Sequence, residues 1–255
     1  MKTNYKDFTE QLLLKGTVYT GNKEPGIKQF SASMLCNDPL QNYLKFKHGS
    51  KDGNKFEANT FGSCFHLGVE QIFKDVENVD TELSMKHELS NGWIISGSVD
   101  LILHQFEKIL DWKTTTATAI SKVHQEGKDS AYALQLGVYK YLLLKTEDKL
   151  YNTSLGMVDK GYSYFKVNKN DQLSFIDLET YTSDEIEEKL LAKTNELQHY
   201  IDLDIMPDKC ANVFPMKRKG EAMKPMRCLY YCDQKDHCPY YYSDHHEINR
   251  LLDGL

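Results

Sequence analysis

Two carboxylates and an amine lie close together in one short stretch of the chain. Asp100 is followed, after ten intervening residues, by Asp111, and Lys113 comes two residues later. Apolar, β-branched runs flank a short polar break here, a pattern typical of an antiparallel hairpin. If the turn centres on residues 105–106, Asp100 falls directly opposite Asp111, where Cβ atoms are about 4.5–5.5 Å apart. Side chains alternate faces along a strand, so Lys113 points to the same side as Asp111.

This pair of acids is costly unless a cation lies between them. Two carboxylates on a half-buried sheet repel, and one would be neutralised by a raised pKa unless a divalent metal compensates. Hard oxygen ligands of this kind suit Mg²⁺ or Mn²⁺. Lys113 can then orient or help deprotonate an attacking water and balance the charge of a phosphate. The alternative is a hairpin with a solvated acidic face and a surface Lys–Asp pair.

Two predicted helices must position further side chains near this hairpin. Residues 61–79 are expected to form the first, which carries His66. Residues 129–144 are expected to form the second after a polar cap, and its Gln135 and Tyr139 are four apart and share one face. Taken singly, His66 also fits an ordinary helix histidine near the core, and the other two fit half-buried helix residues.

The spacing Gly97-x-x-Asp100, then Asp111-x-Lys113 followed by threonines, resembles the PD-(D/E)XK nuclease superfamily and, within it, the RecB-like exonuclease branch. The resemblance implies that Asp100 and Asp111 bind one or two divalent ions. It further implies that the main-chain carbonyl of Trp112 is an additional ligand. Lys113 would position the nucleophilic water for in-line attack on a phosphodiester.

Two further segments lie where that branch places them. A Gly-x-x-x-His segment ending at His66 looks like its helix motif, which implies that His66 is a metal ligand or lies close to the metal. Glu70, one turn later, would support it, and the imidazole would favour Mn²⁺ over Mg²⁺. The Gln135-x-x-x-Tyr139 segment matches the motif that separates this branch from restriction endonucleases. It implies that both side chains hold Lys113 and the DNA backbone in place without adding charge.

Closely spaced cysteines near the C-terminus indicate a bound metal rather than a disulfide, because an intracellular protein keeps its thiols reduced. Some RecB-like nucleases carry one cysteine before the nuclease motifs and three after them, which hold a [4Fe–4S] cluster. The cysteines that match this layout are Cys36, Cys228, Cys232 and Cys238. Two alternatives stay open. One is unligated thiols, and the other is zinc bound by Cys210, Cys228, Cys232 and Cys238, with or without His237.

Composition limits the class of protein. The 255 residues are 40% apolar with a net charge of −6, enough to bury a substantial core. The acidic balance argues against broad adhesion to nucleic acid, although a local basic groove suffices for phosphate contacts. No signal peptide follows Met1, and no stretch approaches the about 20 apolar residues that span a membrane. We therefore expect a soluble, cytoplasmic protein that binds no membrane.

The order of elements predicts an α/β protein with a restriction-endonuclease-like core, a central mixed β-sheet flanked by helices, and a Cys-rich C-terminal segment. Residues 1–60 are expected to form a helical leader and residues 61–205 the nuclease core. Residues 206–255 are expected to pack back on the leader.

Shorter segments carry their own expectations. Strands are predicted at residues 85–89, 162–167 and 173–178, and a polar, Thr-rich loop over the active site at 114–128. Thr182 and Glu185 predict a capping box that begins a long helix reaching about residue 203. A basic patch at residues 217–219 and Lys224 either contacts phosphate or belongs to a solvated loop.

The predicted function is a metal-dependent deoxyribonuclease, an exonuclease acting on DNA ends or single strands in recombination, repair or genome processing. A recombination or helicase protein is the expected partner. One alternative is a catalytically weak accessory that binds DNA ends in a recombination or CRISPR-type complex. Another is an interaction module stabilised by zinc or a cluster. A cleavage assay with Mg²⁺ or Mn²⁺ and a metal analysis discriminate between them.

Overall fold

The computed structural model divides into two compact units, each assembled from segments far apart in the sequence. A sheet unit comprises Gln29–Cys36 and Glu57–Thr194, and a tail unit comprises Met1–Lys28, Asn37–Phe56 and Asn195–Leu255. The residues described are 24–49, 57–115, 117–159, 173–211, 215–216, 224–225, 228 and 232–241.

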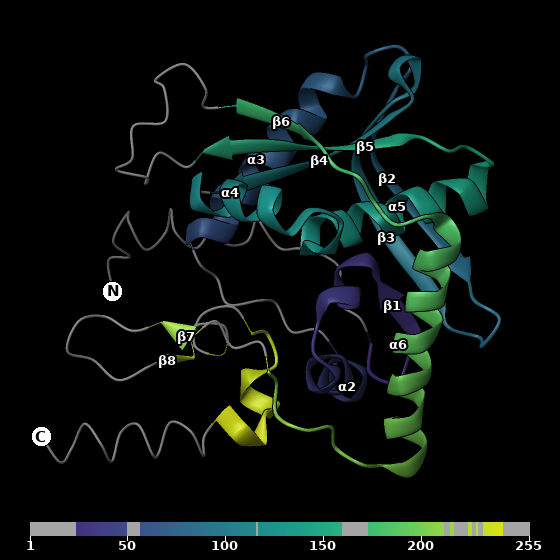
Figure 1. Cartoon of the computed structure of the whole chain (residues 1–255), viewed down its shortest axis with the longest axis vertical. Helices are drawn as coiled ribbons and strands as arrows, with labels where there is room; N and C mark the ends of the chain where they lie inside the picture. Colours follow the sequence, from purple (N-terminus) through teal and green to yellow (C-terminus); the bar gives the residue numbers. More distant parts are fainter. Residues whose placement is uncertain are drawn as a thin grey trace, which may run out of the picture. The chain divides into compact units, whose positions relative to one another are not determined.

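A six-stranded mixed sheet forms the centre of the sheet unit (Figure 1). Its strands are β1 (Gln29–Ser31), β2 (Val79–Glu88), β3 (Ile94–Leu103), β4 (Lys108–Thr115), β5 (Asn152–Asp159) and β6 (Leu173–Asp177). The spatial order is β1-β3-β4-β5-β6, with β2 paired to β3. The β1–β3 and β4–β5 pairs are parallel, and the other three are antiparallel. The predicted α/β fold with a central mixed sheet is therefore confirmed.

The two edges of β3 are used differently. Strand β2 follows one edge along almost its whole length. The other edge is shared, because β1 pairs with Ile94–Ser96 and β4 pairs with Leu101–Leu103. Between them, Gly97–Asp100 pairs with neither strand in the described sheet. The sheet is therefore open on this edge of β3, at the position of Asp100.

Four helices in the described residues accompany the sheet, and two of them begin with well-formed caps. They are α3 (Glu57–Phe73), α4 (Ala117–Glu126), α5 (Ala131–Glu147) and α6 (Ser183–Leu203), with 3₁₀ turns η1 (Ala32–Cys36), η2 (His104–Phe106) and η3 (Gly127–Asp129). The Ser130 hydroxyl accepts a hydrogen bond from the Ala133 N–H at 3.2 Å, so the predicted cap before α5 is confirmed. The capping box of α6 is also confirmed: the Thr182 N–H donates to Glu185 Oε2 at 2.8 Å, and the Glu185 N–H donates back to Thr182 Oγ1 at 3.3 Å.

Helix α3 is anchored on the sheet by an apolar cluster. Val69 packs against Leu101, Leu110 and Trp112, and Phe65 and Phe73 pack against the same group. The ring of Trp112 meets that of Phe65 edge-on, with centroids 5.6 Å apart. These contacts hold the helix over the strands that carry Asp100 and Asp111.

Apart from residues 195–203 of α6, the tail unit contains short elements. They are α2 (Pro39–His48), the two-residue strands β7 (Pro215–Met216) and β8 (Lys224–Pro225), which pair antiparallel, and the 3₁₀ turn η5 (Lys235–His237). Lys45 Nζ lies 3.2 Å from Asp233 Oδ2, and the buried side-chain amide of Gln234 donates to the Gly49 carbonyl at 3.0 Å. Contacts within this unit therefore tie the segment around η5 to the end of α2.

Several expected elements differ from the structure. The prediction of a loop at 114–128 is wrong, because α4 forms there and buries Val123. The Thr-rich composition of this segment did not indicate a helix. Strand β2 begins at Val79, well before residue 85, and β1 and β5 were not expected. The strand predicted at 162–167 and the basic residues 217–219 lie outside the described residues, whereas the strand expected at 173–178 is β6.

In the described ranges, no helix has both the length and the apolar character needed to cross a bilayer.

Candidate active site

The two acids of the hairpin face each other at the point where β3 and β4 separate. The ladder pairs Leu101 with Leu110, which puts Asp100 opposite Asp111, as the sequence predicted. The ladder ends there, and Asp100 Oδ2 accepts a hydrogen bond from the main-chain N–H of Trp112 at 2.6 Å. The N–H and C=O of one strand residue point to the same side. The carbonyl of Trp112, the expected additional ligand, is therefore directed toward this opening.

Asp111 is buried, with 1% of its surface exposed, and its compensating charge comes from Lys113. Lys113 Nζ lies 2.7 Å from Asp111 Oδ2. Burial raises the pKa of Asp111 to about 6, Lys113 opposes this rise, and Asp100 adds to it. Burial lowers the pKa of Lys113, but the charges of Asp111 and Asp100 raise it by more. The pKa of Lys113 is therefore above its usual value. Lys113 is therefore an ammonium at neutral pH, and the ring of Tyr132 on α5 lies 5.9 Å from its Nζ.

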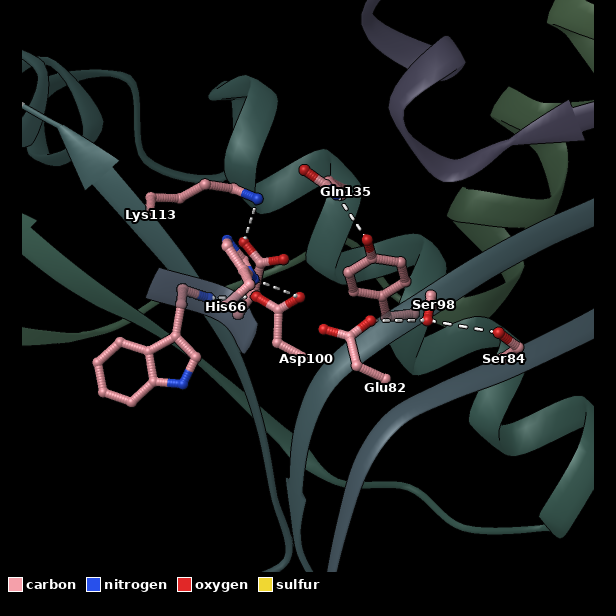
Figure 2. Close-up of polar contacts among 10 residues, drawn as sticks. His66, Glu82, Ser84, Ser98, Asp100, Lys113 and Gln135 are labelled. Carbon is pink, nitrogen blue, oxygen red and sulfur yellow. Dashed lines mark hydrogen bonds and ion pairs between the residues drawn. The ribbon is translucent and has the colours of Figure 1, made fainter. Parts of the chain in front are cut away.

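His66 reaches the acids from α3, next to the Phe65 anchor. Its Nδ1 lies 3.3 Å from Asp100 Oδ1, and the side chain is half-buried (Figure 2). The hydrogen bond to Asp100 raises the pKa of His66, whereas burial acts in the opposite direction. The structure therefore brings His66, Asp100, Asp111 and Lys113 together from three elements. The support of His66 by Glu70 stays a prediction.

Glu82 is a site residue that the sequence interpretation missed. It lies on β2 between the pairs Thr81–Leu101 and Leu83–Val99, so it stands directly opposite Asp100. Desolvation by the surrounding protein raises the pKa of Glu82, and the charge of Asp100 raises it further. The alternation of β2 against β3 could have revealed it, but the first strand was predicted to begin only at residue 85.

Gln135 and Tyr139 lie on one face of α5, as expected from their spacing. The Gln135 side-chain amide donates to the Tyr139 hydroxyl at 2.6 Å (Figure 2). The Tyr139 ring is buried against Gly97 on β3, where an added Cβ would come within 2.7 Å of a ring carbon. Glycine at position 97 therefore lets α5 approach the strand that carries Asp100.

The donor set fits a divalent cation. Ligand atoms of His66, Glu82 and Asp100 all lie within 4.8 Å of one another. Burial raises the pKa of Glu82 and of Asp111, and the charge of Asp100, which lies between them, raises both further. Carboxylate oxygens suit Mg²⁺ and Mn²⁺, and an imidazole shifts the balance toward Mn²⁺.

No cysteine in the described residues is joined in a disulfide, and cysteines occur in both units. Cys36 lies in the sheet unit, where its Sγ is 3.5 Å from the Ala131 carbonyl. Cys228, Cys232 and Cys238 lie half-buried in the tail unit. His237, the optional zinc ligand, stacks its ring on that of His48 with centroids 4.0 Å apart. The cluster expected on Cys36, Cys228, Cys232 and Cys238 stays a prediction.

Comparisons with known proteins agree with this fold. The family model described as the PD-(D/E)XK nuclease superfamily matches residues 76–239, more than half of the chain. No curated protein matches. The solved structure described as SSO0001 shares the fold, with a TM-score of 0.57 and 16% identity over 93% of this chain and 99% of that one.

Two solved exonuclease structures are similar over a smaller part of the chain. The alkaline exonuclease LHK-Exo from Laribacter hongkongensis has a TM-score of 0.45 and 14% identity, over 76% of this chain and 95% of its own. A phage-related exonuclease from Haemophilus somnus 129PT has a TM-score of 0.41 and 14% identity, over 68% of this chain and 81% of its own.

Proposed function

The chain belongs to the PD-(D/E)XK nuclease superfamily, and we propose that it is a Mg²⁺- or Mn²⁺-dependent exonuclease that hydrolyses DNA phosphodiester bonds. The observation that carries this proposal is the meeting of His66, Asp100 and the Asp111–Lys113 pair at the opening between β3 and β4. The Gln135-x-x-x-Tyr139 segment supports the RecB-like exonuclease class, because its two side chains are hydrogen-bonded beside the same strand.

Metal binding falls to residues from three elements. Asp100 and Asp111 would hold one or two divalent ions, together with His66 and the carbonyl of Trp112. The ion would lower the pKa of a bound water and stabilise the charge that develops on the phosphate. Asp100 is held for this task by the N–H of Trp112, which leaves its Oδ1 on the side of His66.

Lys113 supplies a fixed positive charge for the reaction. In the metal-free protein the charges of Asp111 and Asp100 raise the pKa of Lys113 against the effect of burial, so it carries a proton and donates hydrogen bonds. Asp111 holds the ammonium group at 2.7 Å, and the nearby ring of Tyr132 favours the same charged state. From this position Lys113 can orient the attacking water and offset the charge of a phosphate oxygen.

Gln135 and Tyr139 are positioning residues in this proposal. Their side chains are polar and uncharged, so they can restrain Lys113 and the DNA backbone without disturbing the charge balance of the acids. Tyr139 is itself held by its packing on Gly97.

The biological role proposed is DNA recombination, repair or genome processing, with a recombination or helicase protein as partner. A catalytically weak accessory that only binds DNA ends is the alternative. The intact set of Asp100, Asp111 and Lys113 argues for cleavage, since a binding protein has no need of the amine beside the second acid.

A digestion series tests the function. End-labelled single-stranded and double-stranded DNA, with a closed circle as control, is incubated with full-length protein and Mg²⁺, Mn²⁺ or EDTA. We expect Mn²⁺- or Mg²⁺-dependent shortening of the linear DNA, none in EDTA, and an intact circle. The order of label release gives the polarity. Cutting of the closed circle would show that the protein is an endonuclease and not an exonuclease. If no DNA is cut under any condition, the proposal is overturned.

A [4Fe–4S] cluster on Cys36, Cys228, Cys232 and Cys238 is a separate part of the proposal. None of these four described cysteines is joined in a disulfide, so each thiol is in the redox state that cluster ligation requires. Protein purified without oxygen should contain iron and sulfide and absorb near about 400 nm. One equivalent of zinc without iron would favour the Cys210, Cys228, Cys232 and Cys238 site instead.

A further inference from the structure

We propose that Glu82 is a ligand of the divalent ion in this protein, so that β2 and β4 each contribute a carboxylate beside Asp100 of β3. The inference rests on the proposed function, because it concerns the ion of that same site. It adds an acid from β2, on the side of Asp100 away from Asp111.

The position of Glu82 follows from the strand register. Regular pairs on both sides place it directly opposite Asp100 across the β2–β3 hairpin. At Glu82 alone within β2, the backbone takes a φ of +49°, a left-handed conformation that is rare for a residue with a side chain. The backbone therefore leaves the regular strand conformation at the residue that faces Asp100.

Contacts hold the carboxylate of Glu82 near the other candidate ligands. The Ser98 hydroxyl lies 3.4 Å from Glu82 Oε2 and the same distance from the Ser84 hydroxyl (Figure 2). Ligand atoms of Glu82, His66 and Asp100 lie within 4.8 Å of one another. An imidazole and two carboxylates at this separation match the ligands that Mn²⁺ accepts.

The two acids that flank Asp100 differ in whether a positively charged side chain is paired with them. Asp111 has the ammonium of Lys113 at 2.7 Å. In the described part of the chain, no lysine or arginine forms an ion pair with Glu82, and its carboxylate lies with ligand atoms of His66 and Asp100, all within 4.8 Å of one another. The Glu82 side chain is exposed, so a divalent ion from solution can reach its carboxylate beside Asp100.

Metal binding by matched variants tests the inference. Full-length protein is stripped with EDTA, and Mn²⁺ is titrated into unaltered protein, Glu82→Gln and Glu88→Gln, with free Mn²⁺ followed by electron paramagnetic resonance. Glu88 is an exposed acid on the same strand, opposite Ile94, and serves as the control. We expect Glu82→Gln to bind Mn²⁺ at least about tenfold more weakly, an effect of the size seen for changes around metal ligands. Glu88→Gln should bind like the unaltered protein.

Thermal melting provides a second readout that is independent of activity. Removing one of several repelling acids should leave the metal-free Glu82→Gln protein at least as stable as the unaltered one, and should reduce the rise in Tm on adding Mn²⁺. Glycine adopts the positive φ of position 82 without strain. Glu82→Gly should therefore behave like Glu82→Gln, which would exclude backbone strain at this position as the cause of the change.

Each outcome has one meaning. Unchanged Mn²⁺ affinity and an unchanged Tm rise in both Glu82 variants would overturn the role of Glu82 and leave the nuclease proposal standing. Equal weakening by Glu88→Gln would also overturn it, because a general charge effect would then explain the loss. If unaltered protein neither binds Mn²⁺ nor cuts DNA, the proposed function fails, and the role of Glu82 fails with it.

Discussion

The aromatic ring of Tyr139 lies directly against Gly97, so close that a Cβ at position 97 would come within 2.7 Å of a ring carbon. This contact sets how closely α5 approaches β3. The same helix carries Gln135, and the same strand continues to Asp100. A single glycine therefore couples the packing of the helix to the position of the metal-binding acids.

Replacing Gly97 with alanine should disturb the site from a distance. The Tyr139 ring and Leu142 must shift to make room, which we expect to cost about 1–3 kcal/mol of unfolding free energy. DNA cleavage should fall with it, because Tyr139 and Gln135 move. Urea unfolding and initial cleavage rates measure the two effects. Gly68→Ala on α3, where no atom lies within 4 Å of an added Cβ, is the control and should be neutral or stabilising.

The Tyr139→Phe variant removes the hydroxyl group and keeps the aromatic ring, so it tests the hydroxyl alone. The ring still packs on Gly97, so the fold should be retained, with a stability change of about 1 kcal/mol or less. The hydrogen bond from Gln135 is lost, and we expect kcat to fall about tenfold while KM changes little. Tyr141→Phe, on the same helix but outside the candidate site, should keep full activity. An equal kcat for Tyr139→Phe and unaltered protein would contradict a positioning role for the hydroxyl.

Lys113→Met should lower the cleavage rate by about 10²–10³-fold, because a fixed charge beside the reacting phosphate is removed. Asp111→Asn should lose cleavage for a related reason, since it removes a metal ligand and the partner of Lys113. Circular dichroism should show both variants folded. Lys149→Met, which breaks only a surface pair with Glu147, should cleave normally. Full activity in Lys113→Met or Asp111→Asn would remove the residue concerned from the catalytic set.

Metal-free protein should lose stability as the pH rises from about 4 to about 6. Burial raises the pKa of Asp111 from 3.8 to about 6 in the folded state. In that window the folded protein holds a proton that the unfolded chain has released, so stability falls as the pH rises. Urea unfolding in EDTA across this range measures the slope. Asp111→Asn should flatten it, whereas Asp75→Asn, an exposed acid outside the site, should not.

The local part of the site could be predicted from particular residues. The placement of Asp100 opposite Asp111 followed from alternation on two short strands joined by a tight connection. The cap at Ser130 and the capping box of Thr182 and Glu185 followed in the same way, because each depends on residues a few positions apart.

Other parts of the site depend on contacts between distant residues. Glu82 escaped notice because the first strand was predicted to begin at residue 85, whereas β2 begins at Val79. The helix α4 was mistaken for a loop because Ile120 and Val123 are its only large apolar residues, in a segment that is otherwise polar and rich in threonine.

The sequence by itself determined which chemical groups are present and how each hairpin or helix presents them, since strand alternation and helix periodicity are local properties. Only the tertiary structure decided that His66 meets Asp100 and that Tyr139 packs on Gly97. The physical reason is that these distances depend on how α3 and α5 pack on the sheet. The contacts of Phe65 and Val69 with Trp112 exist only in the folded chain.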